Sequence, residues 1–285
     1  MDKIKSTMGK TKGTTGEVKD IMKKPTILTL IEVNYQQRLH DINISINEGG
    51  CLFLLGPNGS GKSTLLSILA GHAQACKGEY LLAGRAVTAY PITELARQRA
   101  WLPQASPPPF AIPVYQFIAL GLHPLGINLE DEQACQVINQ LLVRLDIAKL
   151  VTRNCDQLSG GEWQRVLIAR TLVQISPILN TQSVLCLLDE PLTGLDLKHQ
   201  IEVLQILTEF AEQGITVIAS IHDLNLALNH ASEVLLLKAG RVVGQGDANQ
   251  VLTVDTIKQV YDVDTELLAV NGRQFIVSAA LPASV

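Results

Sequence analysis

The feature that most constrains this 285-residue chain is a glycine-rich loop between a buried strand and a helix. Residues 56–64 read GPNGSGKST and fit the pattern G-x-x-x-x-G-K-[ST]. The apolar run CLFLL precedes the loop, and KSTLLSILAG, which we expect to be helical, follows it. A loop in this setting curls its backbone amides around a phosphate. The chain is therefore predicted to contain a phosphate-binding α/β domain.

The residue types in this loop predict individual roles. The glycines let backbone amides surround a β-phosphate, Lys62 reaches the β- and γ-phosphate oxygens, and Ser63 offers its hydroxyl to Mg²⁺. We expect a nucleotide to contact every residue of the loop: Gly56, Pro57, Asn58, Gly59, Ser60, Gly61, Lys62, Ser63 and Thr64.

Two further apolar segments end in side chains suited to phosphate chemistry. VLCLL ends at Asp189 and Glu190, and ITVIAS ends just before His222. Ligands of open parallel sheets bind at the carboxyl ends of the strands, so these side chains should meet the loop. We expect Asp189 to bind Mg²⁺, Glu190 to polarise the attacking water as a general base, and His222 to reach the γ-phosphate.

A second helix start, QLSGGEWQR at 157–165, has a composition that its own folding does not explain. Ser159 as N-cap and Glu162 three residues later predict a capping box. Gly160 and Gly161 nevertheless occupy the first turn, where each costs about 1 kcal/mol relative to alanine. Bare amides at the positive end of a helix suit a phosphate. The sequence thus contains a second phosphate-binding feature, far downstream of the first.

The distribution of strands and helices predicts three parts. Residues 1–25 are lysine-rich and are expected to form a disordered leader. Strands and helices alternate over 26–104 and 181–285, which we assign to the core, whereas 105–180 is helical without a convincing strand. We therefore expect one α/β domain, 26–285, with a helical subdomain at 105–180.

Composition excludes several classes of protein. The net charge of −4 argues against general affinity for nucleic acid. The sequence has no run of 18 apolar residues, and the N-terminus lacks the apolar core of a signal peptide. Five cysteines show no CxxC spacing, so we expect reduced thiols in the core rather than a metal site.

Taken together, these segments resemble the ATP-binding subunits of ABC transporters over roughly residues 26–260. The resemblance rests on an ordered set of motifs: 56–64, Gln104, LSGGE at 158–162, Asp189-Glu190, LD at 195–196, and His222. It implies a P-loop NTPase core with a helical signature subdomain and an antiparallel β portion near the N-terminus. It also implies Gln104 as a further Mg²⁺ and nucleotide contact, and ATP hydrolysis with Glu190, His222 and Lys62 as catalytic residues.

The resemblance explains the second helix start. In this family the LSGGE motif, here residues 158–162 and called the signature below, binds a nucleotide held by the other subunit. Two identical chains would then sandwich two ATP molecules. Gly160 and Gly161 would let the facing ATP approach, and Ser159 would donate its hydroxyl to the γ-phosphate. The remaining residues implied to contact that nucleotide are Glu162 and Asp196.

Within the family, the chain is most similar to the ATP-binding subunits of vitamin B12 importers. The shared features are GPNGSGKSTLL, PPFAIPV after Gln104, LSGGEWQR, LVQISP and a compact tail. This resemblance implies a homodimer with two membrane permease subunits and a periplasmic cobalamin-binding protein, at the cytoplasmic face of the bacterial inner membrane.

Two other functions stay open. Subunits that drive iron–siderophore or haem import share the overall pattern. Soluble ABC ATPases of translation or DNA repair are a remoter alternative, since they typically carry tandem nucleotide domains or a coiled-coil insertion, which this sequence lacks.

The sequence departs from the family pattern in two places. Many relatives stack an aromatic residue on adenine; Tyr35 is the only aromatic residue nearby, and its spacing is short. It is either that residue or an ordinary tyrosine at a strand end. The common threonine after Glu-Pro is here Leu192.

Overall fold

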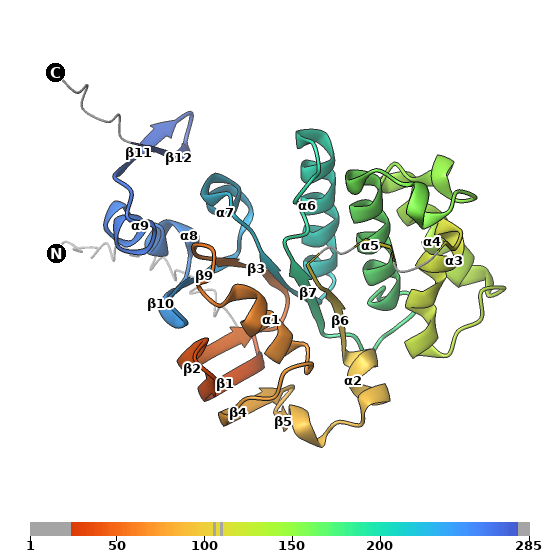
Figure 1. Ribbon diagram of the computed structural model, residues 1–285, viewed down its shortest axis with the longest axis horizontal. Coiled ribbons are helices and arrows are strands. Elements are labelled where there is room, and N and C mark those ends of the chain that lie inside the picture. Colours follow the sequence, from red (N-terminus) through yellow and green to blue (C-terminus); the bar gives the residue numbers. More distant parts are fainter. Residues whose placement is uncertain (1–23, 105–106, 109–110, 279–285) are drawn as a thin grey trace, which may run out of the picture.

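The computed structural model describes residues 24–104, 107–108 and 111–278, and a six-stranded sheet lies at its centre (Figure 1). Neighbouring strands are parallel except at one edge, where β10 runs antiparallel to β9. In spatial order the strands are β10 (Arg241–Gly246), β9 (Glu233–Lys238), β3 (Gly50–Leu55), β8 (Thr216–Ser220), β7 (Leu185–Asp189) and β6 (Arg99–Leu102).

Alternating apolar side chains give this sheet a core on each face. In β3, Cys51, Phe53 and Leu55 belong to the larger core, whereas Leu52 and Leu54 belong to the smaller one. A strand buried on both faces reads as a continuous apolar run, as CLFLL does.

The smaller core lies between the central sheet and an antiparallel sheet. Helix α1 (Lys62–Leu69) fills the space between them, so the helix that follows the glycine-rich loop is covered on both sides (Figure 1). The second sheet has the order β2 (Leu39–Asn47), β1 (Thr26–Tyr35), β4 (Lys77–Leu82) and β5 (Arg85–Ala86). The predicted α/β core and its antiparallel portion near the N-terminus are both confirmed.

Helices cover the other face and form a separate layer beyond it. Between β6 and β7 the described chain is helical, and in Figure 1 helices α3, α4 and α5 lie beyond α6. The elements here are α3 (Val114–Ala119), the 3₁₀ segments η2 (Leu120–Leu125), η3 (Ala148–Leu150) and η4 (Cys155–Gln157), α4 (Glu132–Arg144) and α5 (Gly160–Gln174). The remaining elements are η1 (Val87–Ala89), α2 (Ile92–Gln98), α6 (Leu197–Glu212), α7 (Leu224–His230), α8 (Ala248–Val251) and α9 (Val254–Tyr261).

The chain ends in a hairpin of β11 (Thr265–Val270) and β12 (Arg273–Ser278). The Asn225 side chain on α7 fixes it by donating to the Ile276 carbonyl at 3.0 Å and accepting from the Ile276 amide at 2.8 Å.

Some sequence predictions lie outside the described residues, and one is wrong. The leader, apart from Lys24 and Pro25, part of the PPFAIPV segment and the end of the tail cannot be compared. All five cysteines are unpaired, and Cys51, Cys155 and Cys186 are buried, but Cys76 is exposed. Cys76 precedes β4 in a connecting segment, so its neighbouring apolar strand does not bury it. Within the described ranges, no helix is both long and apolar enough to cross a membrane.

We predict that Gly121→Ala destabilises the fold. A Cβ atom there would lie 2.5 Å from the Arg170 carbonyl oxygen and would push η2 away from α5. Overpacking of this kind costs roughly 1–3 kcal/mol, which urea unfolding followed by circular dichroism would detect. Gly160→Ala is the matched control, because a Cβ there meets nothing within 4 Å. An unchanged urea midpoint for Gly121→Ala would contradict the close contact.

Candidate nucleotide site

The glycine-rich loop leaves β3 in a conformation that only glycine adopts easily. Gly56 has φ 146°, and a Cβ there would lie 2.2 Å from the Leu237 carbonyl oxygen. Gly59 and Gly61 also have positive φ, and Gly61 directly precedes α1. Side chains at positions 56 and 61 would therefore collide with neighbouring atoms, so this path of the loop requires glycine there.

Lys62, in the first turn of α1, is held inside the curve of the loop. It is buried, and its Nζ donates to the carbonyl oxygens of Gly56 at 2.7 Å and Pro57 at 3.2 Å. Burial lowers the pKa of Lys62, and the negative charges of Glu190 and Asp189 oppose that shift. Its ammonium is thus fixed at the loop with few polar partners, as a phosphate-binding cation requires.

The two acidic residues at the end of β7 point in different directions because the backbone turns at Glu190. Asp189 is buried and accepts a hydrogen bond from Ser220 Oγ at 2.6 Å, while Ser220 Oγ accepts from the Glu190 amide at 2.8 Å. Glu190 has φ 51°, in the left-handed region, which turns it away from the strand. One hydroxyl on the neighbouring strand β8 thus fixes both residues.

His222 follows β8 and contacts Glu190 directly. Its Nε2 lies 2.7 Å from Glu190 Oε1, and the Thr193 hydroxyl donates to Glu190 Oε2 at 3.3 Å. The Glu190 side chain is 17% exposed and that of His222 is 46% exposed. The structure therefore places the predicted base and the predicted γ-phosphate contact side by side, within reach of solvent.

A cavity of about 520 Å³ lies between the loop and Glu190, and His222 is not part of its lining. Gln104, which follows β6 and is itself exposed, lines it together with Glu190. The complete lining is Arg38, Asn58, Gly59, Gly61, Lys62, Ser63, Thr64, Gln104 and Glu190. Residues brought together from β1–β2, the loop, β6 and β7 thus form one site, and residues 159–162 are not among them.

The lining contains Arg38 where the sequence pointed to Tyr35. Tyr35, at the end of β1, packs against the smaller core and is not in the lining. Arg38 lies in the turn after β1, and this turn approaches the loop closely: a Cβ on Gly61 would lie 3.1 Å from the Arg38 carbonyl oxygen. An arginine guanidinium is planar and can stack on an aromatic ring. Arg38 could therefore stack on the base of a nucleotide bound at the loop. Arg38 lies in none of the sequence motifs, so sequence reasoning did not find it.

The signature helix α5 begins with the predicted capping box. Ser159 Oγ accepts from the Glu162 amide at 3.4 Å, and the Ser159 amide and hydroxyl donate to Glu162 Oε2 at 2.8 and 2.9 Å. These bonds lower the pKa of the Glu162 carboxyl. The Ser159 hydroxyl is therefore engaged within its own helix end and must rotate to serve a ligand.

The two signature glycines differ in what surrounds them. A Cβ on Gly160 would meet nothing within 4 Å, whereas a Cβ on Gly161 would lie 2.9 Å from the Gly194 carbonyl oxygen. Gly160 thus has the open space expected of a ligand-facing position. The expectation that an approaching ATP accounts for both glycines is incomplete, because Gly161 is already required by close packing within the chain.

Further contacts join α5 to the segment after β7. The buried Gln164 side chain donates to the carbonyl oxygens of Pro191 at 3.0 Å and Glu190 at 3.3 Å. Asp196 caps α6 by accepting from the His199 amide at 2.9 Å, and this bond lowers the pKa of the Asp196 carboxyl. Leu192, in the same segment, is buried.

The donors at the site fit a small hard cation. Ser63 and Gln104 line one cavity with Glu190, and Asp189 directly precedes Glu190, so the available donors are hydroxyl, amide and carboxylate oxygens. Mg²⁺ prefers oxygen ligands and takes few of them from protein when phosphates are present. No group of three or more His, Cys, Asp or Glu that could hold a metal occurs in the described ranges.

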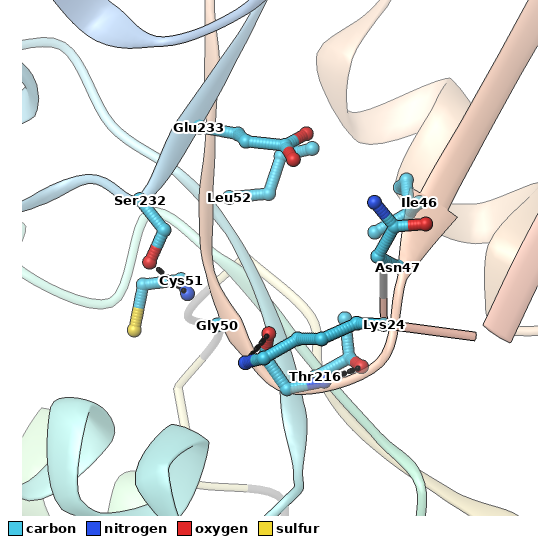
Figure 2. Close-up of a pocket in the computed structure, with 10 residues that line it drawn as sticks. Lys24, Ile46, Asn47, Gly50, Cys51, Leu52, Thr216, Ser232 and Glu233 are labelled. Atoms are coloured by element: carbon cyan, nitrogen blue, oxygen red, sulfur yellow. Dashed lines mark hydrogen bonds between the residues drawn. The ribbon is translucent and has the colours of Figure 1, made fainter. Parts of the chain in front are cut away.

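A second cavity, of about 420 Å³, lies at the amino-terminal ends of the central strands (Figure 2). Gly50, Thr216 and Glu233, the first residues of β3, β8 and β9, line it. Ligands of open α/β sheets bind at the carboxyl ends, so this cavity is separate from the candidate nucleotide site.

Comparison with known proteins agrees with this geometry. The family model described as ABC transporter matches residues 39–193. The chain is 39% identical over 255 residues to the vitamin B12 import ATP-binding protein of Yersinia pseudotuberculosis, covering 90% of this chain and 99% of that protein. The protein of the same name from Escherichia coli is 36% identical over 252 residues, with coverage of 88% and 98%.

Solved structures show the same fold. An inward-facing transporter described as metal-chelate type ABC matches with a TM-score of 0.72 and 28% identity, over 89% of this chain and 97% of that chain. A subunit of the cbiONQ ABC transporter complex of Clostridium perfringens matches with a TM-score of 0.67 and 28% identity, over 83% and 94%. The matched family model and the identity over most of its length show that this chain belongs to the ABC transporter family, as an ATP-hydrolysing subunit.

Proposed function

We propose that this chain powers the import of vitamin B12 as the ATP-hydrolysing subunit of a membrane transporter. The observation that carries the proposal is the 39% identity, over 90% of the chain, to a vitamin B12 import ATP-binding protein. Its partners would be a second copy of the chain, two membrane permease subunits and a periplasmic cobalamin-binding protein. Its place would be the cytoplasmic face of the bacterial inner membrane.

In this proposal the cavity beside the loop binds ATP. Residues 56–64 surround the phosphates, Lys62 holds the β- and γ-phosphate oxygens, and Arg38 lies beside the loop. Ser63, Gln104 and Asp189 hold Mg²⁺, which neutralises charge on the phosphates. We assign residues 105–180 as the helical subdomain that contacts the permease, with Gln104 at its junction with the core.

Hydrolysis is assigned to Glu190 and His222. Glu190 polarises the attacking water, since a carboxylate beside rather than on the metal can accept its proton. His222, 2.7 Å from Glu190, is placed to contact the γ-phosphate from the same edge.

The signature completes the site of the partner chain. Helix α5 presents its N-terminus with open space at Gly160, and residues 159–162 lie outside the lining of this chain's own cavity. Two chains arranged head to tail would bring residues 159–162 and Asp196 of each to the ATP of the other. ATP then stabilises the closed dimer, and hydrolysis of ATP lets the two chains separate.

Import of a metal chelate is the second candidate function. The structural similarity to a metal-chelate type ABC transporter favours it, at 28% identity. The two functions share the same ATPase chemistry and differ in the permease and binding protein that the chain contacts.

Reconstitution separates the two candidates. The chain is purified with its permease in vesicles, and ATPase activity is measured with binding protein loaded with cobalamin or with an iron–siderophore complex. Stimulation by the cobalamin-loaded protein alone supports B12 import. Stimulation by the siderophore-loaded protein alone would overturn it in favour of the metal-chelate function.

We predict that Glu190→Gln reduces ATP hydrolysis by about 10²-fold or more, the scale of general-base effects. ATP binding should survive because Lys62, Ser63 and Asp189 are unchanged. The variant should therefore form a stable dimer with ATP on size-exclusion chromatography. The double variant Lys62→Ala/Glu190→Gln is the control and should stay monomeric. Wild-type turnover in Glu190→Gln would refute the base assignment.

We predict that Ser159 acts across the dimer. Ser159→Arg chains and Lys62→Ala chains should each be inactive alone, because both composite sites are damaged. A mixed dimer places both lesions in one site and leaves the other whole, so mixing should restore part of the ATPase activity. Continued inactivity of verified mixed dimers would argue that each chain binds its ATP alone.

A further inference from the structure

His199, in the first turn of α6, contacts both Asp196, the N-cap of α6, and Arg165 on α5. Its Nδ1 lies 2.8 Å from Asp196 Oδ1, and its Nε2 lies 2.6 Å from Arg165 Nη1 on α5. The His199 side chain is only 15% exposed, and Arg165 is buried. His199 therefore bridges the cap of α6 and the signature helix.

The partners of His199 determine its protonation. Arginine is always charged and only donates hydrogen bonds, so Nε2 must accept the bond from Arg165. Asp196 can only accept, so Nδ1 must carry the proton. The bridge thus requires a neutral imidazole with its proton on Nδ1.

The carboxylates of Glu162 and Asp146 also lie near the bridge, and the charge of Arg165 contributes to the lowered pKa of Glu162. Asp146 approaches both members of the bridge. One of its carboxylate oxygens lies 3.6 Å from His199 Nε2 and 3.9 Å from Arg165 Nη1. This side chain is 63% exposed, so solvent weakens its interactions with both groups. The direct contact of the guanidinium with Nε2 is the shorter one.

Arg165 extends the bridge into the signature itself. Its Nε donates to the Gly161 carbonyl oxygen at 3.4 Å, and its Nη1 donates to the carbonyl oxygen of Leu145 at 3.0 Å. Gly161 also packs against Gly194, two residues before Asp196. The signature turn and the 194–196 segment are therefore joined twice, by backbone packing and by His199.

We propose that His199 is a positioning residue that holds Asp196 and the signature helix in one fixed arrangement, so that both reach the partner chain's ATP together. The role rests on the composite site proposed above. It predicts that removal of His199 weakens the dimer formed with ATP without changing how the separate chain binds ATP, since His199 does not line the cavity beside the loop.

The tautomer is tested on the wild-type chain without nucleotide. Two-bond ¹H–¹⁵N correlation spectra of ¹⁵N-histidine-labelled protein distinguish Nδ1–H from Nε2–H imidazole. The His199 signals are assigned by their loss in His199→Gln. A neutral ring with Nδ1 protonated is expected. An Nε2–H ring, or a ring protonated at neutral pH, would overturn the bridge.

The positioning role is tested in the Glu190→Gln background, where ATP should stabilise the dimer. Adding His199→Leu should weaken dimerisation with ATP by about 10-fold or more, as expected for the loss of a charge-assisted hydrogen bond. ATP affinity of the monomer should stay unchanged. Gln205→Leu, an exposed position farther along α6, is the matched control and should dimerise normally.

The outcomes separate the two proposals. If Glu190→Gln dimerises with ATP and the His199→Leu double variant does so equally tightly, the positioning role is wrong and the composite site stands. If Glu190→Gln itself does not dimerise, the composite site fails and the positioning role fails with it. The tautomer measurement would still report the bridge within one chain.

Discussion

The arrangement of the site depends on the register of three neighbouring parallel strands. Leu54 of β3 and Asp189 of β7 are both paired with Ser220 of the strand between them. The segments that follow these three residues, including the glycine-rich loop, Glu190 and His222, consequently leave the sheet at the carboxyl ends of the strands. A shift of one residue in β7 would turn Asp189 to the opposite face of the sheet and separate it from Ser220. Because the strand before Asp189 is apolar on both faces, the polar contact at its end opposes such a shift: the buried Asp189 would lose its hydrogen bond from Ser220 Oγ.

A second set of contacts is made by backbone rather than by side chains. A Cβ on Gly56 would lie 2.2 Å from the Leu237 carbonyl oxygen, and a Cβ on Gly161 would lie 2.9 Å from the Gly194 carbonyl oxygen. Glycine makes both approaches possible, but for different purposes. At Gly56 it admits a neighbouring strand end, and at Gly161 it lets the start of α5 pack against the backbone of Gly194. Gly56 needs both a positive φ and the lack of a side chain, whereas Gly161 needs only the lack of a side chain.

The fold and the cavity at the loop could be predicted because short local patterns encode them. Strand, loop and helix follow one another around residues 56–64, and the acidic pair ends an apolar run. Arg38 was missed because its position depends on how the β1–β2 turn folds back on the loop, a contact distant from any motif. Tyr35, whose spacing is short, is partly buried against the smaller core and does not line the cavity.

The signature shows why contacts between segments distant in the chain could not be predicted from the sequence. Its capping box is encoded within four residues, so the sequence predicts it fully. The packing of Gly161 against Gly194 joins segments that are far apart in the chain, and no periodicity reports it. The bridge through His199 is equally hidden, because a histidine three residues after Asp196 looks like an ordinary helix residue until Arg165 is placed beside it.

The left-handed backbone at Glu190 restricts which residues evolution can place there. Its φ of 51° is strained for any side chain and most strained for branched ones such as valine. A change from glutamate to valine would thus remove the charge and also distort the chain between Asp189 and the segment that packs against α5. A branched residue at position 190 therefore meets two independent barriers, one chemical and one conformational, whereas an unbranched residue such as glutamine removes only the charge.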